Sequence, residues 1–185
     1  MAKPLEQMTN EELWQLFPIV LREHDPTWAE LFSRERGLLA QAVGAENIAA
    51  VSHIGSTAVP GLIAKPTIDI LLEITDGADT QKLKTDMVGA GYLFSPQPEK
   101  PAPHMMFLKG YTPAGFAGQA FHVHVRYAGD WDEKIFCAYL QTHAQAAREY
   151  GLLKRRLQKE FEHDRDGYTR EKTDFIRGIL KQAGR

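Results

Sequence analysis

The sequence has 185 residues, 43% of them hydrophobic and 25% charged, which fits one globular domain and excludes disordered and fibrous classes. Its 22 basic and 24 acidic side chains give a formal charge of −2, so no general attraction to nucleic acid or to an anionic membrane is expected. One cysteine, Cys137, excludes an internal disulfide, and the lack of a signal-peptide core or of roughly 20 consecutive apolar residues predicts a cytoplasmic protein without a membrane span.

Two helices are predicted at the start of the chain. Thr9 is followed three residues later by Glu12, the pattern of a capping box, which predicts a short helix that ends near residue 18. Asp25 is a good N-cap and precedes a proline, which is favoured at the first helical position. Apolar residues then recur at helical spacing, so we expect a helix over residues 26–43.

The next segments alternate between strands and a helix. Residues 48–54 form a short apolar run that predicts a buried strand, and the proline-containing segment 57–66 predicts a loop. Residues 67–74, TIDILLEI, are the strongest strand signal in the chain. Residues 79–90 have a helical pattern, and an extended piece is expected to begin after them.

The second half is predicted to hold a hairpin followed by helices. Residues 96–103 contain four prolines and predict an exposed linker. Residues 104–109 and 119–127 predict two strands, and the glycine-rich segment 110–118 between them predicts a long, mobile loop. Beyond residue 132, apolar stripes predict two or three helices, with a break at Asp166-Gly167.

This order of elements predicts an α/β protein of the α+β type, in which helices flank a small mixed sheet. We expect a single domain over residues 1–185. Residues 1–19 would form an N-terminal extension, and residues 132–185 a helical C-terminal part. The order of elements alone does not predict an activity or an oligomeric state.

The end of the first predicted strand is a candidate phosphate site. Gly55 and Ser56 lead into a turn with Thr57, where backbone N–H groups and hydroxyls can point at a phosphate that glycine allows to approach. Lys65 and Lys109 could neutralise the phosphate charge. The structural alternative is a simple strand-to-turn junction.

Asp69 is the candidate catalytic and metal-binding carboxylate. It interrupts an apolar strand, where an ionised side chain is costly unless a partner, a metal or a solvent-lined cleft meets it. The period of two places Asp69, Leu71 and Glu73 on one face of the strand. Divalent metals that act on phosphates take oxygen ligands, so a carboxylate beside a phosphate-binding turn suits that chemistry. The alternative is a structural ion pair with Lys65.

His122 and His124 share one face of the strand 119–127 and are candidate metal ligands. Two imidazoles at i and i+2, together with Asp69, would form a set of two histidines and one carboxylate for a divalent metal, either Mg²⁺ or a transition metal. The histidines could instead contact a phosphate or hold structural carbonyl groups. The basic run 154–156 is predicted to be a solvated helix face, whereas Tyr168, Arg170 and Lys172 could fold back on the site.

The stretch HIGSTAVPGLIAKPTIDILLEI closely resembles the signature of the GrpB family, which belongs to the nucleotidyltransferase superfamily. The segments DPTWAELFSRE, AFHVHVRYAGDWDEKIFCAYL and EYGLLKRRLQKEFEHDRDGYTREKTDFI extend the resemblance to residues 20–183. It implies a nucleotidyltransferase-type core, with Gly-Ser at one strand end and an acidic residue on the next strand.

One departure from this superfamily concerns the second carboxylate. Nucleotidyltransferases usually carry Asp-x-Asp on the second strand, but here the pattern is Asp69-Ile70-Leu71, and Glu73 lies far along the strand for sharing an ion. The residues therefore favour one metal held partly by histidine. The leading hypothesis is a nucleotidyltransferase-like protein that binds a phosphorylated ligand or a nucleotide. The alternatives are a non-catalytic binding module that kept the fold, and a transition-metal hydrolase.

Overall fold

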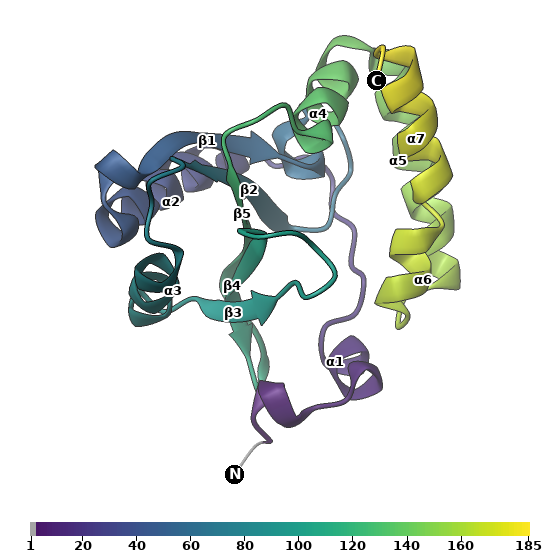
Figure 1. Ribbon diagram of the computed structural model, residues 1–185. Helices are drawn as coiled ribbons and strands as arrows, with labels where there is room; N and C mark the ends of the chain where they lie inside the picture. The colour runs from purple at the N-terminus through teal and green to yellow at the C-terminus, as the bar shows by residue number, and fades with distance from the viewer. Residues whose placement is uncertain (1–2) are drawn as a thin grey trace.

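A mixed sheet of five strands, in the order β1-β2-β5-β4-β3, has helices packed on both of its faces in the computed structural model, which describes residues 3–185 (Figure 1). Only β2 and β5 run parallel, and the other neighbouring strands are antiparallel. The strands are β1 (Ile48–Ile54), β2 (Thr67–Ile74), β3 (Leu93–Pro96), β4 (Met105–Thr112) and β5 (Gly115–Tyr127). The helices are α1 (Asn10–Leu16), α2 (Thr27–Val43), α3 (Thr80–Gly89), α4 (Asp132–Thr142), α5 (Ala144–Glu160), α6 (Arg165–Arg170) and α7 (Thr173–Gln182).

The predicted α/β class, a mixed sheet flanked by helices, is confirmed. Residues 1 and 2 of the predicted N-terminal extension lie outside the described residues. Among residues 3–185, no helix combines the length and the apolar character needed to cross a membrane. After β5 the chain is helical, as predicted, but it forms four helices rather than two or three.

Capping residues begin the first two helices where the sequence predicts. The Thr9 hydroxyl accepts a hydrogen bond from the Glu12 amide, and the Glu12 carboxylate accepts one from the Thr9 amide, which completes the capping box. At the start of α2, the Asp25 carboxylate accepts a hydrogen bond from the Thr27 amide at 2.9 Å. Each bond satisfies a backbone donor that the first helical turn leaves free.

The main core lies on one face of the sheet, under α2 and α3. Ile68, Ile70 and Leu72 point to this face from β2 and are completely buried, together with Leu39 of α2 and Met87 of α3. Because side chains alternate along a strand, Asp69, Leu71 and Glu73 point to the opposite face, which the C-terminal helices cover (Figure 1).

The predicted mobile loop over residues 110–118 is wrong. The strands β4 and β5 continue through most of this segment, and Thr112 pairs with Gly115 across a tight turn. Gly110 has a φ of +85°, and a Cβ atom there would lie 2.5 Å from the Gln119 carbonyl oxygen. This glycine therefore allows an irregularity within the hairpin, where the register shifts, and does not mark a loop.

The predicted helix break at Asp166-Gly167 is also wrong. The helix α5 ends at Glu160, and Gly167 lies buried within α6. A Cβ atom on Gly167 would meet the ring of Phe161 at 2.6 Å. The glycine is therefore needed because the chain packs closely at this point, and the break lies a few residues earlier.

Lys109 lies on the face of the sheet that carries the main core, under α2 and α3, and not on the face of Asp69. Its ammonium group contacts the carboxylate of Glu35 at 2.7 Å, and Glu35 also accepts a short hydrogen bond from the Tyr92 hydroxyl. The side chain of Glu35 is 4% exposed, so these two partners compensate the burial of its charge. Burial, followed by the hydrogen bond to Glu35, raises the pKa of Tyr92.

Replacing Glu35 with alanine should destabilise the fold by about 2–4 kcal/mol, because the Tyr92 hydroxyl and the Lys109 ammonium would lose a buried acceptor. Urea denaturation of the wild type and the variant measures this difference. Arg34→Ala is the control: it removes an exposed pair with Glu30 on the same helix and should cost less than about 0.5 kcal/mol. Equal losses in the two variants would contradict a structural role for Glu35.

Candidate functional site

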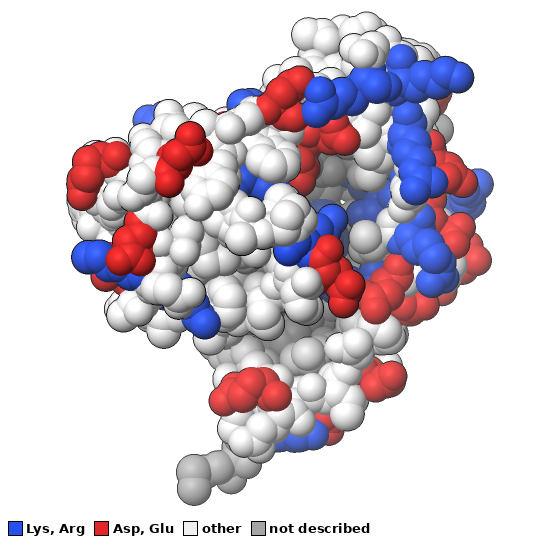
Figure 2. Space-filling model, viewed as in Figure 1, with Lys and Arg blue, Asp and Glu red and all other residues white. Residues whose placement is uncertain are grey.

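A cleft of about 750 Å³ lies between the Asp69 face of the sheet and the C-terminal helices. The ends of β1, β2 and β5 form one wall, and α5, α6 and α7 form the other. Figure 2 shows a hollow between the two parts of the molecule, with lysine and arginine side chains around it. Gly55, Ser56 and Lys65 line this cleft together with Asp69 and both candidate histidines.

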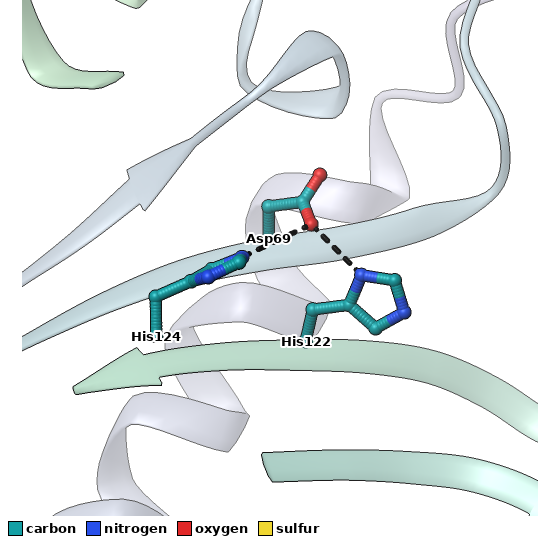
Figure 3. Close-up of side chains that lie close together, drawn as sticks. All are labelled: Asp69, His122 and His124. Carbon is teal, nitrogen blue, oxygen red and sulfur yellow. Dashed lines mark ion pairs between the residues drawn. The ribbon is translucent and has the colours of Figure 1, made fainter. Parts of the chain in front are cut away.

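Asp69, His122 and His124 converge in the cleft from two adjacent strands (Figure 3). The parallel register places Asp69 beside His122, and His124 points to the same face two residues further along β5. The Asp69 Oδ1 atom lies 3.2 Å from Nδ1 of His122 and 3.8 Å from Nε2 of His124. Three ligand atoms bound to one tetrahedral metal at about 2.1 Å would lie about 3.4 Å apart, so this arrangement fits one ion after small side-chain shifts.

The position of the Asp69 carboxylate depends on Gly55. This glycine has a φ of +71°, and a Cβ atom on it would lie 2.6 Å from Oδ2 of Asp69. The strand β1 pairs antiparallel with β2, which places the end of β1 directly beside Asp69. Gly55 therefore leaves the space that the carboxylate occupies, a role that the sequence alone does not reveal.

The two histidines keep Asp69 ionised. Burial raises the pKa of Asp69, but its interactions with the neighbouring His122 and His124 lower it by more, so that the net shift is downward. Burial lowers the pKa of His122 to about 4, although Asp69 acts in the opposite direction. At neutral pH His122 is therefore uncharged, and one of its nitrogens carries a lone pair.

Tyr111 orients the ring of His122 from the side opposite Asp69. Its hydroxyl lies 2.7 Å from Nε2 of His122, and the two rings stack with centroids 5.8 Å apart. If Nδ1 of His122 binds a metal, its Nε2–H donates to the Tyr111 oxygen, which fixes the tautomer that ligation requires. The sequence analysis missed Tyr111, because the hairpin over residues 105–127 was predicted to be open at this point.

Four basic side chains line the same cleft as the candidate metal-binding set of Asp69, His122 and His124: Lys65, Lys154, Arg165 and Lys172, called the basic wall below. Burial is the largest cause that lowers the pKa of Lys65 and of Lys154 to about 7, and the pKa of Lys172 to about 8. Neighbouring cations lower the pKa values of all three lysines further, whereas Asp69 raises them, and for Lys172 the effect of Asp69 is larger than that of Arg165. Such a group of mutually repelling, desolvated cations favours an anionic ligand.

The prediction that Lys154 lies on a solvated helix face is wrong. It is 2% exposed, and its ammonium group donates a short hydrogen bond to the Ile63 carbonyl oxygen and lies 4.7 Å from the centre of the Tyr150 ring. The sequence does contain the signal for this position. Tyr150, Lys154 and Leu157 follow the i, i+4, i+7 spacing of a single helix stripe, which faces the cleft and the core.

Of the three residues predicted to fold back on the site, Tyr168 and Lys172 line the cleft. Arg170 does not, because its exposed side chain pairs with Glu171 at 3.5 Å. The Lys172 ammonium lies 4.3 Å from the centre of the Tyr168 ring. Tyr168 is 1% exposed, and its hydroxyl is a buried group without a hydrogen-bond partner among residues 3–185. An unpaired hydroxyl of this kind is available to a ligand.

The structure places Thr57 and Lys109 outside the cleft. The Thr57 hydroxyl lies 3.0 Å from the ring of His53 and donates to the Thr67 carbonyl oxygen at 3.3 Å, so it supports the turn. Lys109 is on the opposite face of the sheet, as described above. These two expected phosphate contacts are therefore corrected, because strand alternation and local hydrogen bonds direct both side chains elsewhere.

Comparisons with known proteins identify relatives over nearly the whole chain. The family model described as "GrpB protein" matches residues 18–182. A UPF0157 protein of Pseudomonas aeruginosa is 37% identical over 86% of this chain, which spans 65% of that protein. The glutamate-rich protein GrpB of Alkalihalophilus pseudofirmus is 32% identical over 89% of this chain and 95% of its own length. The crystal structure of GrpB from Enterococcus faecalis has a TM-score of 0.74 at 31% identity and covers 89% of this chain and 96% of its own.

Replacing Gly55 with alanine should displace Asp69 and abolish the binding of a divalent metal, because the new methyl group would occupy the space of the carboxylate. Gly61→Ala is the matched control, since Gly61 has a φ of +72° and a Cβ atom there meets nothing within 4 Å. Both variants place a side chain at a positive φ, which costs about 1–3 kcal/mol, but only the first should lose metal binding. Calorimetric titration with Mn²⁺ measures this, and equal metal affinity in both variants would contradict the role of Gly55.

Proposed function

The chain belongs to the GrpB family, and we propose that it binds a phosphorylated small molecule of the nucleotide class together with one divalent metal ion. The observation that carries the proposal is that one cleft holds both the metal-binding set and the basic wall. Proteins commonly neutralise phosphate oxygens with a metal ion and cationic side chains that line one cleft.

One carboxylate and two imidazoles suit a single ion of the transition series, such as Mn²⁺ or Zn²⁺, better than Mg²⁺, which prefers oxygen ligands. Asp69, His122 and His124 would hold the ion, and it would polarise a phosphoryl oxygen of the ligand. The Tyr111 hydroxyl contacts Nε2 of His122 and would hold the ring in place for binding the ion through Nδ1.

Nucleotidyl transfer with two magnesium ions needs a second carboxylate close to Asp69, and the described residues do not supply one there. Leu71, in the position of that carboxylate, is completely buried. Glu73 accepts a hydrogen bond from the Gly129 amide at 3.1 Å and pairs with Lys134 at 3.0 Å. Glu73 is therefore a structural residue, and the proposal is for one ion.

The basic wall would bind the phosphate groups. Lys65 lies just before β2, and Arg165 is the first residue of α6. Lys154 lines the cleft from α5, and Lys172 lines it from the residue before α7. Ser56 adds a hydroxyl at the turn that follows β1. An anion of several charges would relieve the repulsion between these cations and restore their full charge.

A second candidate function is favoured by the two imidazoles: hydrolysis of a phosphate ester by a water molecule on the single metal ion. Imidazole and carboxylate ligands with an open position are typical of hydrolytic metal sites, and the metal would lower the pKa of the bound water. Release of inorganic phosphate from nucleotides in the presence of Mn²⁺ or Zn²⁺ tests this activity. Binding without any turnover identifies a non-catalytic binding module.

Replacing Asp69 with asparagine should abolish the stabilisation by Mn²⁺ while leaving the fold within about 1 kcal/mol of the wild type, because the amide oxygen still accepts a hydrogen bond from His122. Melting curves with and without Mn²⁺ and ATP measure both effects. Glu133→Gln is the control, since it removes a carboxylate that lines the same cleft but pairs with Arg126. A loss of about 3–5 kcal/mol with an intact Mn²⁺ response would mean that Asp69 is a structural ion-pair residue.

The affinity for tripolyphosphate without metal should fall as the pH rises from about 7 to about 9, because Lys65, Lys154 and Lys172 have pKa values lowered to between about 7 and about 8 and lose their protons. Binding an anion raises these pKa values, so complex formation should take up protons. Calorimetry in buffers of different ionisation enthalpy measures the uptake. The anion itself becomes more charged over this range, so an affinity that increases with pH would contradict the role of the lysines.

A further inference from the structure

A second, smaller pocket adjoins the cleft and is built mainly from aromatic and apolar side chains. Its volume is about 190 Å³. The rings of Phe17, Tyr111 and Phe116 form a group in which the three centroids lie 4.9 to 5.2 Å apart. Phe17 comes from the segment after α1, and the other two rings come from the ends of β4 and β5.

This aromatic pocket is continuous with the metal and phosphate site. Lys65, Thr67 and Arg165 line both spaces, so two members of the basic wall stand at the boundary between them. Tyr111 connects them as well, because its ring lines the pocket while its hydroxyl contacts His122. A single molecule can therefore reach the basic wall and the three rings at the same time.

Two of the large apolar side chains that line the pocket are exposed to solvent. Phe116 is 49% exposed and Val20 is 41% exposed. Apolar surface beside a polar cleft is typical of ligand sites, in which apolar groups provide contact area and a few polar groups fix orientation.

We infer that this pocket holds the aromatic ring of the ligand whose phosphate groups bind the basic wall, and that the ligand class is accordingly nucleoside phosphates. The inference rests on the proposed function and adds the recognition of the base. A volume of about 190 Å³ is below the roughly 300–1,000 Å³ of whole ligand sites, so it suits one ring system rather than a complete ligand or a long acyl chain. The three rings offer stacking and edge contacts to a planar group, whichever base it is.

The test compares ATP with tripolyphosphate, since the two probes share the phosphate chain and differ in the nucleoside. Affinities are measured by calorimetry with Mn²⁺ present, for the full chain. The wild type should bind ATP about tenfold more tightly than tripolyphosphate, the gain expected from stacking of one base. UTP should show a similar gain, because aromatic stacking depends little on the base.

The variant Phe116→Ala should lose most of this gain and keep its affinity for tripolyphosphate within about twofold. Because Phe116 is half-exposed, the substitution should leave the fold intact. Leu152→Ala is the matched control: it also removes an exposed apolar side chain, 68% exposed, but from a helix position that lines neither space. This control should bind both probes as the wild type does.

Equal affinities of the wild type for ATP and tripolyphosphate would overturn the base subsite and leave the proposed phosphate binding intact. An unchanged preference for ATP in Phe116→Ala would also overturn it, because the nucleoside would then lie elsewhere. If neither probe binds, the proposed function fails and the subsite fails with it. A preference for ATP that is lost only in Phe116→Ala supports the inference.

Discussion

The parallel pairing of β2 with β5 is the constraint on which the site depends. It sets Asp69 opposite His122 and leaves both on the face that α2 and α3 do not cover. A slip of one residue in this register would turn Asp69 into the core with Ile68 and Ile70, where its charge would have no partner. The apolar residues that alternate with Asp69 prevent that slip, so the packing of one face determines the chemistry of the other.

The cleft contains one central carboxylate and several cations, and different neighbours determine the pKa values of the two kinds of group. The two neighbouring imidazoles keep Asp69 ionised, whereas burial and neighbouring cations lower the pKa values of Lys65, Lys154 and Lys172. The four groups do not form a close ion pair, since Asp69 makes its nearest contacts with His122 and His124. The cleft therefore presents a negative group and several positive groups that do not neutralise one another.

Local patterns in the sequence predict much of this structure. Capping residues and the period of two locate α1, α2 and β2, and the same alternation predicts that Asp69, His122 and His124 each project from one face of a strand. The prediction fails where a distant part of the chain decides. Lys109 pairs with Glu35, which is 74 residues away. The glycines of 110–118 lie within an irregular hairpin whose two strands continue beyond their predicted ends. Lys154 has the periodicity of a buried position, but its charge favours a solvated interpretation until Ile63 and Tyr150 are seen beside it.

The two walls of the cleft come from separate stretches of the chain. The metal-binding set is complete by residue 124, whereas Lys154, Arg165 and Lys172 belong to helices that follow it (Figure 1). The hydrogen bond from Lys154 to the Ile63 carbonyl oxygen connects α5 with the segment before β2. A molecule held by both walls would act as an additional cross-link between the sheet and the helical half, and its binding would therefore stabilise their contact as well as the site.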